Sequence, residues 1–268
     1  MKTSVLDDGF VQYIDHMGND HAVVQAARTS YVGVSVDSDA EKDERLLRYL
    51  MRHKHWTPFE MCILKIGIRI PMDAWRQFVR HRLFSINEYS TRYQPAIDSR
   101  SVASEWRAQS TNNKQGSNGL IADDVSHALS FDEARLHSHI EGVYQNRLKQ
   151  GVAREQARKD LPLSTYTEAI VECDLRGWLH FLGLRMDPHA QLEIRQYANA
   201  IHDMIVNLFP ISAQAFEDYH LNALTLTACD IQALTDPSYK FPTKREADEF
   251  EAKRERLKYG LKGNGSGT

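Results

Sequence analysis

Apolar and polar residues alternate most strictly between Cys62 and Ile70. Every second residue from Leu64 to Ile70 carries a large aliphatic side chain, and the residues between them are charged or glycine. Successive side chains of an extended chain point to opposite faces. The pattern therefore predicts a strand over 62–70 that buries one face and leaves the other polar.

Apolar residues recur at helical spacing through much of the remaining chain. Four apolar side chains between Leu46 and Met51 form one stripe behind an acidic first turn, which is typical of a helix. Pro71 and the pair Asp187–Pro188 stand where helices can begin, because the first turn needs no amide donor from proline. The spacing predicts helices over 39–52, 72–82, 130–149, 152–159, 174–182, 187–208 and 243–258.

These elements indicate one helix-rich domain. We expect an α+β fold with a small, mainly antiparallel sheet, formed by residues 1–240. Residues 241–268 are predicted to form a charged C-terminal helix and a disordered tail from Gly263 to Thr268. The polar stretch from Ser99 to Asp124 is predicted to be a mobile loop or lid.

Composition narrows the function classes. The 268 residues carry a net charge of −3, so nothing in the overall charge favours binding to nucleic acid. The three cysteines are odd in number and far apart, which favours reduced thiols and a cytoplasmic location over a disulfide framework. No apolar run approaches membrane-spanning length, so no membrane association is expected.

The segment from Arg80 to Arg92 reads RHRLFSINEYSTR and is the strongest chemical signal in the chain. Guanidinium groups bind phosphate oxygens through paired, charge-assisted hydrogen bonds, and serine hydroxyls can complete such a cradle. The segment therefore predicts an anion site. From these residues alone, a salt-bridged helix end in which Arg80 pairs with Glu88 is also open.

The pattern RHRxxSxNExSxR is complete in this segment, and it resembles the signature of the flavin-dependent thymidylate synthases. That resemblance implies synthesis of dTMP from dUMP. It further implies FAD as hydride donor, NADPH as the reductant of FAD, and methylenetetrahydrofolate as carbon donor. A homotetramer with its sites at subunit interfaces is implied as well.

Further stretches match the same family and assign the nucleotide residues. Arg158 precedes Leu161-Pro162-Leu163, which is similar to the family's R…LPL stretch, and Arg185 opens a segment similar to LRxDxxAQ. The resemblance implies that Arg185 is catalytic and stabilises the uracil ring as its N3 ionises. The implied contacts of dUMP are Gln77, Arg80, Glu88, Ser90, Arg92, Arg158 and Arg185.

The flavin residues come from three stretches. The run from His55 to Glu60 resembles the family's HxTPFE segment, and the run from Asp174 to His180 falls where the family has NxRxxxN. Asp174 and His180 replace the two asparagines of that pattern. The implied contacts of FAD are His55, Thr57, Arg80, His81, Arg82, Glu88, Asp174, Arg176 and His180.

Several alternatives remain open at this point. Outside the resemblance, His55 is typical of a surface histidine, and Arg185 could simply pair with Asp187. The arginine cluster could also grip nucleic-acid phosphates, although the net acidic chain speaks against it. No metal site is expected, because His53 and His55 have no HExxH partner. None of the cysteines lies in a context suited to nucleophilic attack.

Overall fold

The computed structural model describes residues 1–32, 39–97, 99–110 and 116–260. The chain divides into two compact units, Met1–Gln214 and Ala215–Thr268. The predicted disordered tail lies outside the described residues. The domain boundary expected at residue 240 stays a prediction.

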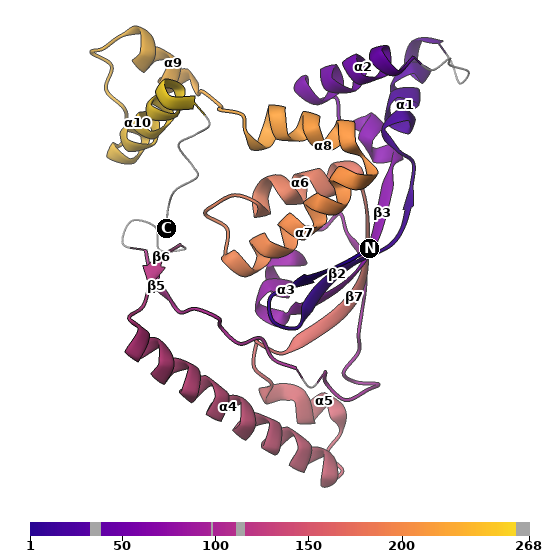
Figure 1. The fold of residues 1–268 in the computed structure, drawn as a ribbon, viewed down its shortest axis with the longest axis vertical. Helices are drawn as coiled ribbons and strands as arrows, with labels where there is room; N and C mark the ends of the chain where they lie inside the picture. Colours follow the sequence, from indigo (N-terminus) through magenta and orange to yellow (C-terminus); the bar gives the residue numbers. More distant parts are fainter. Residues whose placement is uncertain (33–38, 98, 111–115, 261–268) are drawn as a thin grey trace. The chain divides into compact units, whose positions relative to one another are not determined.

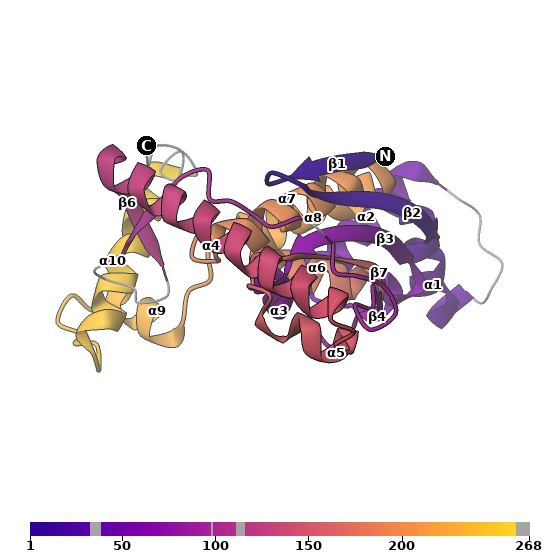
Figure 2. The same cartoon turned by 90° about the horizontal axis from the view of Figure 1, so that it is seen from below.

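A five-stranded sheet organises the first unit. Its strand order is β1-β2-β3-β7-β4, and every neighbouring pair is antiparallel (Figure 2). This confirms the predicted α+β class with a small antiparallel sheet. The strands are β1 (Lys2–Val5), β2 (Gly9–Met17), β3 (Ile63–Pro71), β4 (Ser85–Glu88) and β7 (Tyr166–Asp174).

Strand β3 confirms the alternation seen in the sequence. Its side chains Leu64, Ile66, Ile68 and Ile70 are buried. Helices pack against this face of the sheet, and Figure 1 shows them together on one side. They are α3 (Met72–Phe78), α6 (Leu175–Arg185) and α7 (Leu192–Leu208). The buried aliphatic face and these helices therefore form the core that positions the helix ends.

The opposite face of the sheet is polar. Lys65 on β3 pairs with Glu172 on β7 at 3.3 Å, and Arg69 pairs with Glu168 at 3.8 Å and with Asp8 at 2.8 Å. Such cross-strand pairs help to hold the register of an antiparallel sheet.

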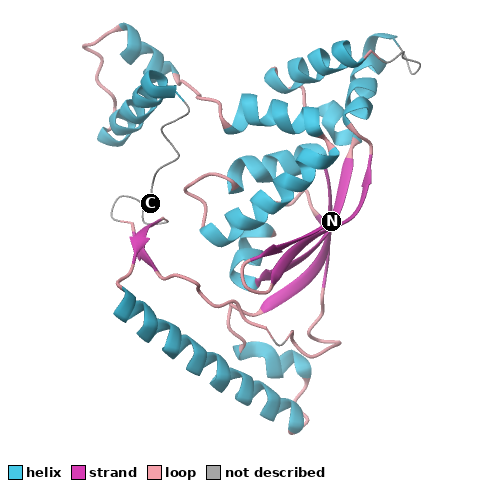
Figure 3. Ribbon diagram, viewed as in Figure 1, coloured by secondary structure: helices cyan, strands magenta, loops and turns pink. Residues whose placement is uncertain are grey.

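The first unit holds further helices, drawn in cyan in Figure 3. The predicted helix over 39–52 is confirmed, and Asp39 caps it by accepting from the Lys42 amide. These helices are α1 (Asp20–Val32), α2 (Ala40–Arg52), α4 (Asp123–Lys149), α5 (Arg154–Ala157) and α8 (Pro210–Phe216), the last extending into the second unit. Short 3₁₀ turns are η1 (Thr57–Met61) and η2 (Arg158–Asp160).

Several predicted helices were wrong in their extent. Helix α3 ends at Phe78 rather than at residue 82, and the chain turns at Val79 and pairs as strand β4 soon afterwards. Helix α7 begins at Leu192 because the Asp187 carboxylate instead accepts from the His189 amide at 2.8 Å, in a separate turn. The predicted helix over 152–159 is split into α5 and η2.

The polar stretch over 99–124 is more regular than expected. It contains a two-stranded hairpin of β5 (Arg107–Gln109) and β6 (Ser117–Leu120), and α4 begins at Asp123, before the predicted residue 130. Residues 111–115, at the centre of the predicted lid, lie outside the described residues.

The second unit contains the predicted charged helix. Helix α10 (Lys244–Tyr259) begins with a capping box between Thr243 and Glu246. Within this unit, Lys253 of α10 pairs with the buried Asp230 at 2.7 Å. The unit also holds the π-turn η3 (Glu217–Leu221) and α9 (Ala228–Thr235). No helix in the described part of the chain is long and apolar enough to cross a membrane.

Candidate functional site

The signature segment is held by its apolar side chains and leaves its polar ones outside. Phe84 packs against Phe78 and Trp178, with ring centroids 4.9 and 4.6 Å apart. The backbone turns tightly between them, where the His81 amide donates to the Phe78 carbonyl at 3.1 Å. Arg80 and Arg82 belong to this turn and are exposed. A rigid aromatic base therefore presents two guanidinium groups to solvent.

A first group of predicted site residues surrounds Arg185, at the end of α6. Its Nε donates to Nε2 of His81 at 3.0 Å, and its Nη2 donates to the Gln77 carbonyl oxygen at 3.3 Å. The His180 ring lies 6.1 Å from the His81 ring. We call these residues the Arg185 group and include the neighbouring Arg80 in it. Its members are Gln77, Arg80, His81, His180 and Arg185.

Positive charge is concentrated in the Arg185 group. Burial lowers the pKa of His81 to about 4, and the charges of Arg185 and His180 act in the same direction. Burial, and then the charge of Arg80, lower the pKa of Arg185. His81 is therefore neutral near pH 7 and can accept the hydrogen bond from Arg185.

The two ion pairs left open by the sequence, Arg80 with Glu88 and Arg185 with Asp187, are not formed. Glu88 accepts from the Thr167 hydroxyl at 2.8 Å, and Asp187 contacts His189. Within the described ranges, Arg80, Arg82 and Arg185 have no carboxylate partner. Their charge remains available to an anionic ligand.

A second group lies after strand β4. Arg158 donates to the hydroxyl of Thr91, and Arg92 pairs with Glu155 of α5 at 3.5 Å. The Arg92 amide donates to the Ser90 hydroxyl oxygen at 3.4 Å. We call Ser90, Thr91, Arg92, Glu155 and Arg158 the Arg158 group. In the part of the chain that is described, no hydrogen bond or ion pair joins it to the Arg185 group.

The remaining predicted flavin residues lie around η1 and the start of α6. Arg176 pairs with Glu60, whereas His55 and Thr57 are exposed. Asp174 accepts from the Gly177 amide at 2.7 Å and so caps α6. Aspartate and asparagine both cap helices well, which accounts for a carboxylate at this position.

Helix α6 approaches strand β7 closely at Gly177. A Cβ atom there would lie far inside van der Waals contact with the Cys173 sulfur, so any other residue requires that side chain or the helix to shift. Burial raises the pKa of the Cys173 thiol to about 12, with a further contribution from Asp174. Burial likewise raises the pKa of Cys62 to about 11. Both thiols are therefore poor nucleophiles at neutral pH, as expected from the sequence.

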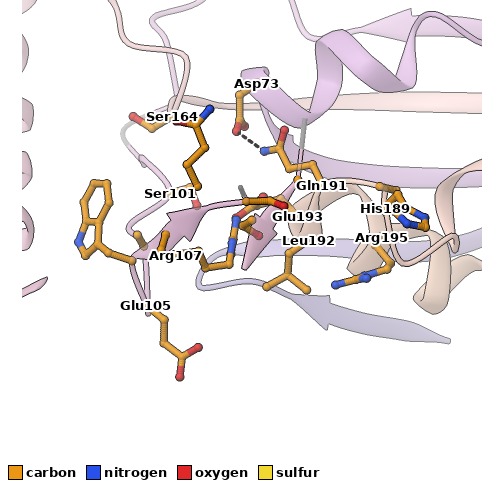
Figure 4. Close-up of a pocket in the computed structure, with 18 of the residues that line it drawn as sticks. Asp73, Ser101, Glu105, Arg107, Ser164, His189, Gln191, Leu192, Glu193 and Arg195 are labelled. Atoms are coloured by element: carbon orange, nitrogen blue, oxygen red, sulfur yellow. Dashed lines mark hydrogen bonds and ion pairs between the residues drawn. The ribbon is translucent and has the colours of Figure 1, made fainter. Parts of the chain in front are cut away.

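A cavity adjoins the Arg185 group without containing any of its residues. It encloses about 730 Å³ between the β5–β6 hairpin and the turn before α7 (Figure 4). Across it, Arg107 pairs with Glu193 at 2.6 Å. Two residues on its wall, Asp73 and Gln191, were not among the predicted site residues, although Gln191 closes the segment similar to LRxDxxAQ. Gln191 connects the wall to the Arg185 group, because its Oε1 accepts from Gln77 at 2.6 Å.

Comparison with known proteins decides the family. Residues 12–211 match the family model described as thymidylate synthase complementing protein. This chain belongs to that family. Flavin-dependent thymidylate synthase from Gluconobacter oxydans is 44% identical over 84% of this chain and 75% of that protein. The enzyme of the same name from Treponema denticola is 36% identical over 96% of this chain and 97% of its own length.

A solved structure agrees with the fold. The UMP/dUMP methylase PolB from Streptomyces cacaoi, bound with 5-Br dUMP, superposes with a TM-score of 0.75 at 30% identity. It covers 81% of this chain and 98% of its own. The motifs from His55 to Gln191 all lie inside the matched residues, which confirms the family that the signature predicted.

The described residues contain no cluster of three or more histidine, cysteine or acidic side chains arranged to hold a metal ion. His53 and His55 have ring centroids 6.4 Å apart and edge-to-face geometry, which is an aromatic contact rather than a ligand pair.

Proposed function

We propose that this protein is a flavin-dependent thymidylate synthase. It converts dUMP to dTMP, with methylenetetrahydrofolate as the carbon donor, FAD as the cofactor and NADPH as the reductant. One observation carries the proposal: Arg80, Arg82 and Arg185 lie in or beside the family signature and, in the described structure, have no carboxylate to neutralise them. Of the ligands that the reaction requires, dUMP, FAD and NADPH carry phosphates and methylenetetrahydrofolate carries carboxylates, so all are anionic.

The residues predicted for FAD fit that cofactor chemically. FAD carries a pyrophosphate, and the exposed guanidinium groups of Arg80 and Arg82 are suited to bind one. When bound, FAD supplies the hydride of the reaction. His55, Thr57, His81, Glu88, Asp174, Arg176 and His180 complete the proposed set. Arg176 is held by Glu60, so its guanidinium is oriented before any ligand arrives.

Arg185 has the catalytic role in this proposal. His81 and the Gln77 carbonyl fix its guanidinium from two directions without neutralising its charge. A fixed positive charge near the uracil ring stabilises negative charge that develops there in the transition state. Gln77, Arg80, Glu88, Ser90, Arg92 and Arg158 bind the nucleotide.

We further propose a homotetramer in which one subunit supplies the Arg185 group and another supplies the Arg158 group. Both groups contain residues assigned to dUMP, yet no hydrogen bond or ion pair joins the groups in the described part of the chain, which supports this arrangement. Closed symmetry allows one surface to serve twice. The free thiols of Cys62, Cys173 and Cys229 support a cytoplasmic location for this enzyme.

Mixing two variants, one impaired in turnover and the other in dUMP binding, tests the shared site when activity is assayed at low dUMP concentration. Arg185→Ala and Arg158→Ala subunits, unfolded together and reassembled at equal concentration, should restore about a quarter of the sites if each site draws on two subunits. Each variant reassembled alone is the control. No recovery in the mixture, with normal tetramers by sedimentation, would refute the sharing.

The function itself is tested by a flavin spectrum and a product assay. Protein saturated with FAD should show an absorbance band that dUMP perturbs, and it should form dTMP when NADPH and methylenetetrahydrofolate are added. UMP is assayed in parallel, because the name of the PolB neighbour includes that nucleotide. Absence of saturable flavin binding would reject the proposal.

A further inference from the structure

Three side chains form a hydrogen-bonded relay from the cavity wall to the Arg185 group. Asp73 and Gln77 lie one turn apart on α3, and Gln191 bridges them from the turn before α7. Gln191 Nε2 donates to Asp73 Oδ2 at 3.1 Å, as Figure 4 shows, and Gln77 Nε2 donates to Gln191 Oε1 at 2.6 Å. The second oxygen of Asp73, Oδ1, accepts from the Ala74 amide at 2.7 Å.

The carboxylate sets the direction of this relay. An ionised carboxylate only accepts hydrogen bonds, so Gln191 must turn its NH₂ group toward Asp73 and its oxygen toward Gln77. Gln77 must then use its own NH₂ group on Gln191. Its Oε1 receives no hydrogen bond from the described residues and is left as a free acceptor, while the backbone carbonyl of the same residue accepts from Arg185.

We propose that Asp73 is a positioning residue that makes Gln77 present its carbonyl oxygen to a hydrogen-bond donor of the bound nucleotide. This inference rests on the proposed function, because Gln77 is assigned to dUMP. The nucleotide carries two neutral donors that could fill the role, the N3–H of uracil and the 3′-hydroxyl of the sugar. The relay therefore acts on nucleotide recognition although Asp73 does not touch the ligand.

Asp73→Asn keeps the size of the side chain and should reverse the direction of the hydrogen bonds in the relay. An asparagine has one oxygen, and if that oxygen keeps the Ala74 amide, its NH₂ group faces Gln191. Gln191 then turns over, and Gln77 follows and presents NH₂ to the nucleotide. A donor would face a donor, so dUMP should bind about tenfold more weakly.

A double variant separates positioning from a structural role. In Asp73→Asn with Gln191→Glu, the carboxylate moves to position 191 and accepts from both neighbours, so Gln77 regains its original orientation. The double variant has the same charge as the wild type, and dUMP affinity should return to within about twofold. Gln191→Glu alone places two carboxylates together and should bind poorly. Asp132→Asn, at an exposed carboxylate on α4, is the matched control.

Calorimetric titration of the FAD-loaded protein with dUMP measures each affinity. Titrations with N3-methyl-dUMP and with the analogue that lacks the 3′-hydroxyl then identify the donor. In the wild type, one analogue should bind about tenfold more weakly than dUMP, and in Asp73→Asn this penalty should vanish. If the penalties are unchanged in Asp73→Asn, or if the double variant binds no better than the single ones, the inference is overturned.

These experiments distinguish failure of the relay from failure of the proposed function. If the wild type does not bind dUMP at all, the function itself is wrong. If it binds dUMP and Asp73→Asn binds equally well, only the relay is wrong. Should Asp73→Asn fail to fold, Gln191→Leu breaks both relay bonds without changing charge and should show a similar loss of affinity. Wild-type affinity in that variant would refute the relay.

Discussion

The Arg185 group and the Arg158 group both carry arginines assigned to dUMP, but they hold them differently. Arg185 is fixed by two neutral acceptors, the His81 ring and the Gln77 carbonyl. Arg92, in contrast, faces the carboxylate of Glu155 at 3.5 Å. The first group keeps its full positive charge, whereas the second has part of its charge already compensated.

Because of this difference, we expect the two groups to have different roles in the reaction. A guanidinium that is oriented by neutral partners can stabilise charge developing on a substrate without first giving up an ion pair. An exposed arginine in a salt bridge must exchange partners when phosphate arrives, and the gain is small. The Arg185 group should therefore govern the rate, and the Arg158 group should govern nucleotide affinity.

Arg185→Ala should give the largest effect. Loss of a positive charge that acts in the transition state costs about 3 kcal/mol, so kcat should fall by about two orders of magnitude. Steady-state kinetics at saturating dUMP, methylenetetrahydrofolate and NADPH measure this, with Arg135→Ala on the exposed face of α4 as a control. A variant that keeps most of its kcat would contradict the assigned role.

Acidification should weaken the Arg185 group through His81. The folded protein protonates His81 near pH 4, whereas an unfolded chain does so near 6.5, so the unfolded state binds more protons between these values. The stability contributed by neutral His81 is complete above about pH 6.5 and is lost as the pH falls toward 4.

Two-dimensional NMR of labelled histidine should place the His81 titration midpoint near 4. His81→Gln keeps an acceptor without a titrating group and should lose this part of the pH dependence in denaturant unfolding. An ordinary midpoint in the wild type would show that Arg185 is not held by a neutral ring.

Ser90→Ala should act mainly on binding. The Ser90 hydroxyl has no adjacent general base, so it is assigned to the nucleotide rather than to covalent catalysis. Loss of one neutral hydrogen bond costs about 1 kcal/mol, and KM for dUMP should rise about fivefold with kcat nearly unchanged. Abolished turnover at saturating dUMP would instead point to a nucleophile.

Glu155→Gln should have the smallest effect and the opposite sign. Removing the carboxylate frees Arg92, so dUMP affinity should rise by about twofold to threefold. Titration at low and at high salt checks the cause, because added salt should reduce the gain. Unchanged affinity at low salt would mean that Arg92 does not contact the nucleotide.

The sequence predicted the buried elements better than the exposed ones. Strand β3 was found because one face is fully buried, which imposes strict alternation. Strand β4 was missed, since all of its residues are exposed and it forms only by pairing with β7. The start of α7 was misplaced because Asp187 caps a local turn that periodicity does not reveal.

The motifs name candidate site residues, and the structure shows how these residues are grouped. The signature and the other family motifs named the arginines, but which of them meet a carboxylate depends on tertiary structure. Glu155 and Arg92 come together only when α5 folds against the segment after β4. Asp73 was missed for a similar reason, because its partner Gln191 is 118 positions away in the chain.

The absence of a side chain at Gly177 has a consequence for how this protein tolerates substitutions. Helix α6 carries Arg176, His180 and Arg185, which are assigned to two different ligands, and its distance from the sheet depends on the missing side chain beside Cys173. An added methyl group would require either the Cys173 sulfur or the start of this helix to shift. In a library of random substitutions, position 177 should therefore resemble a catalytic residue, although it contributes no chemistry of its own.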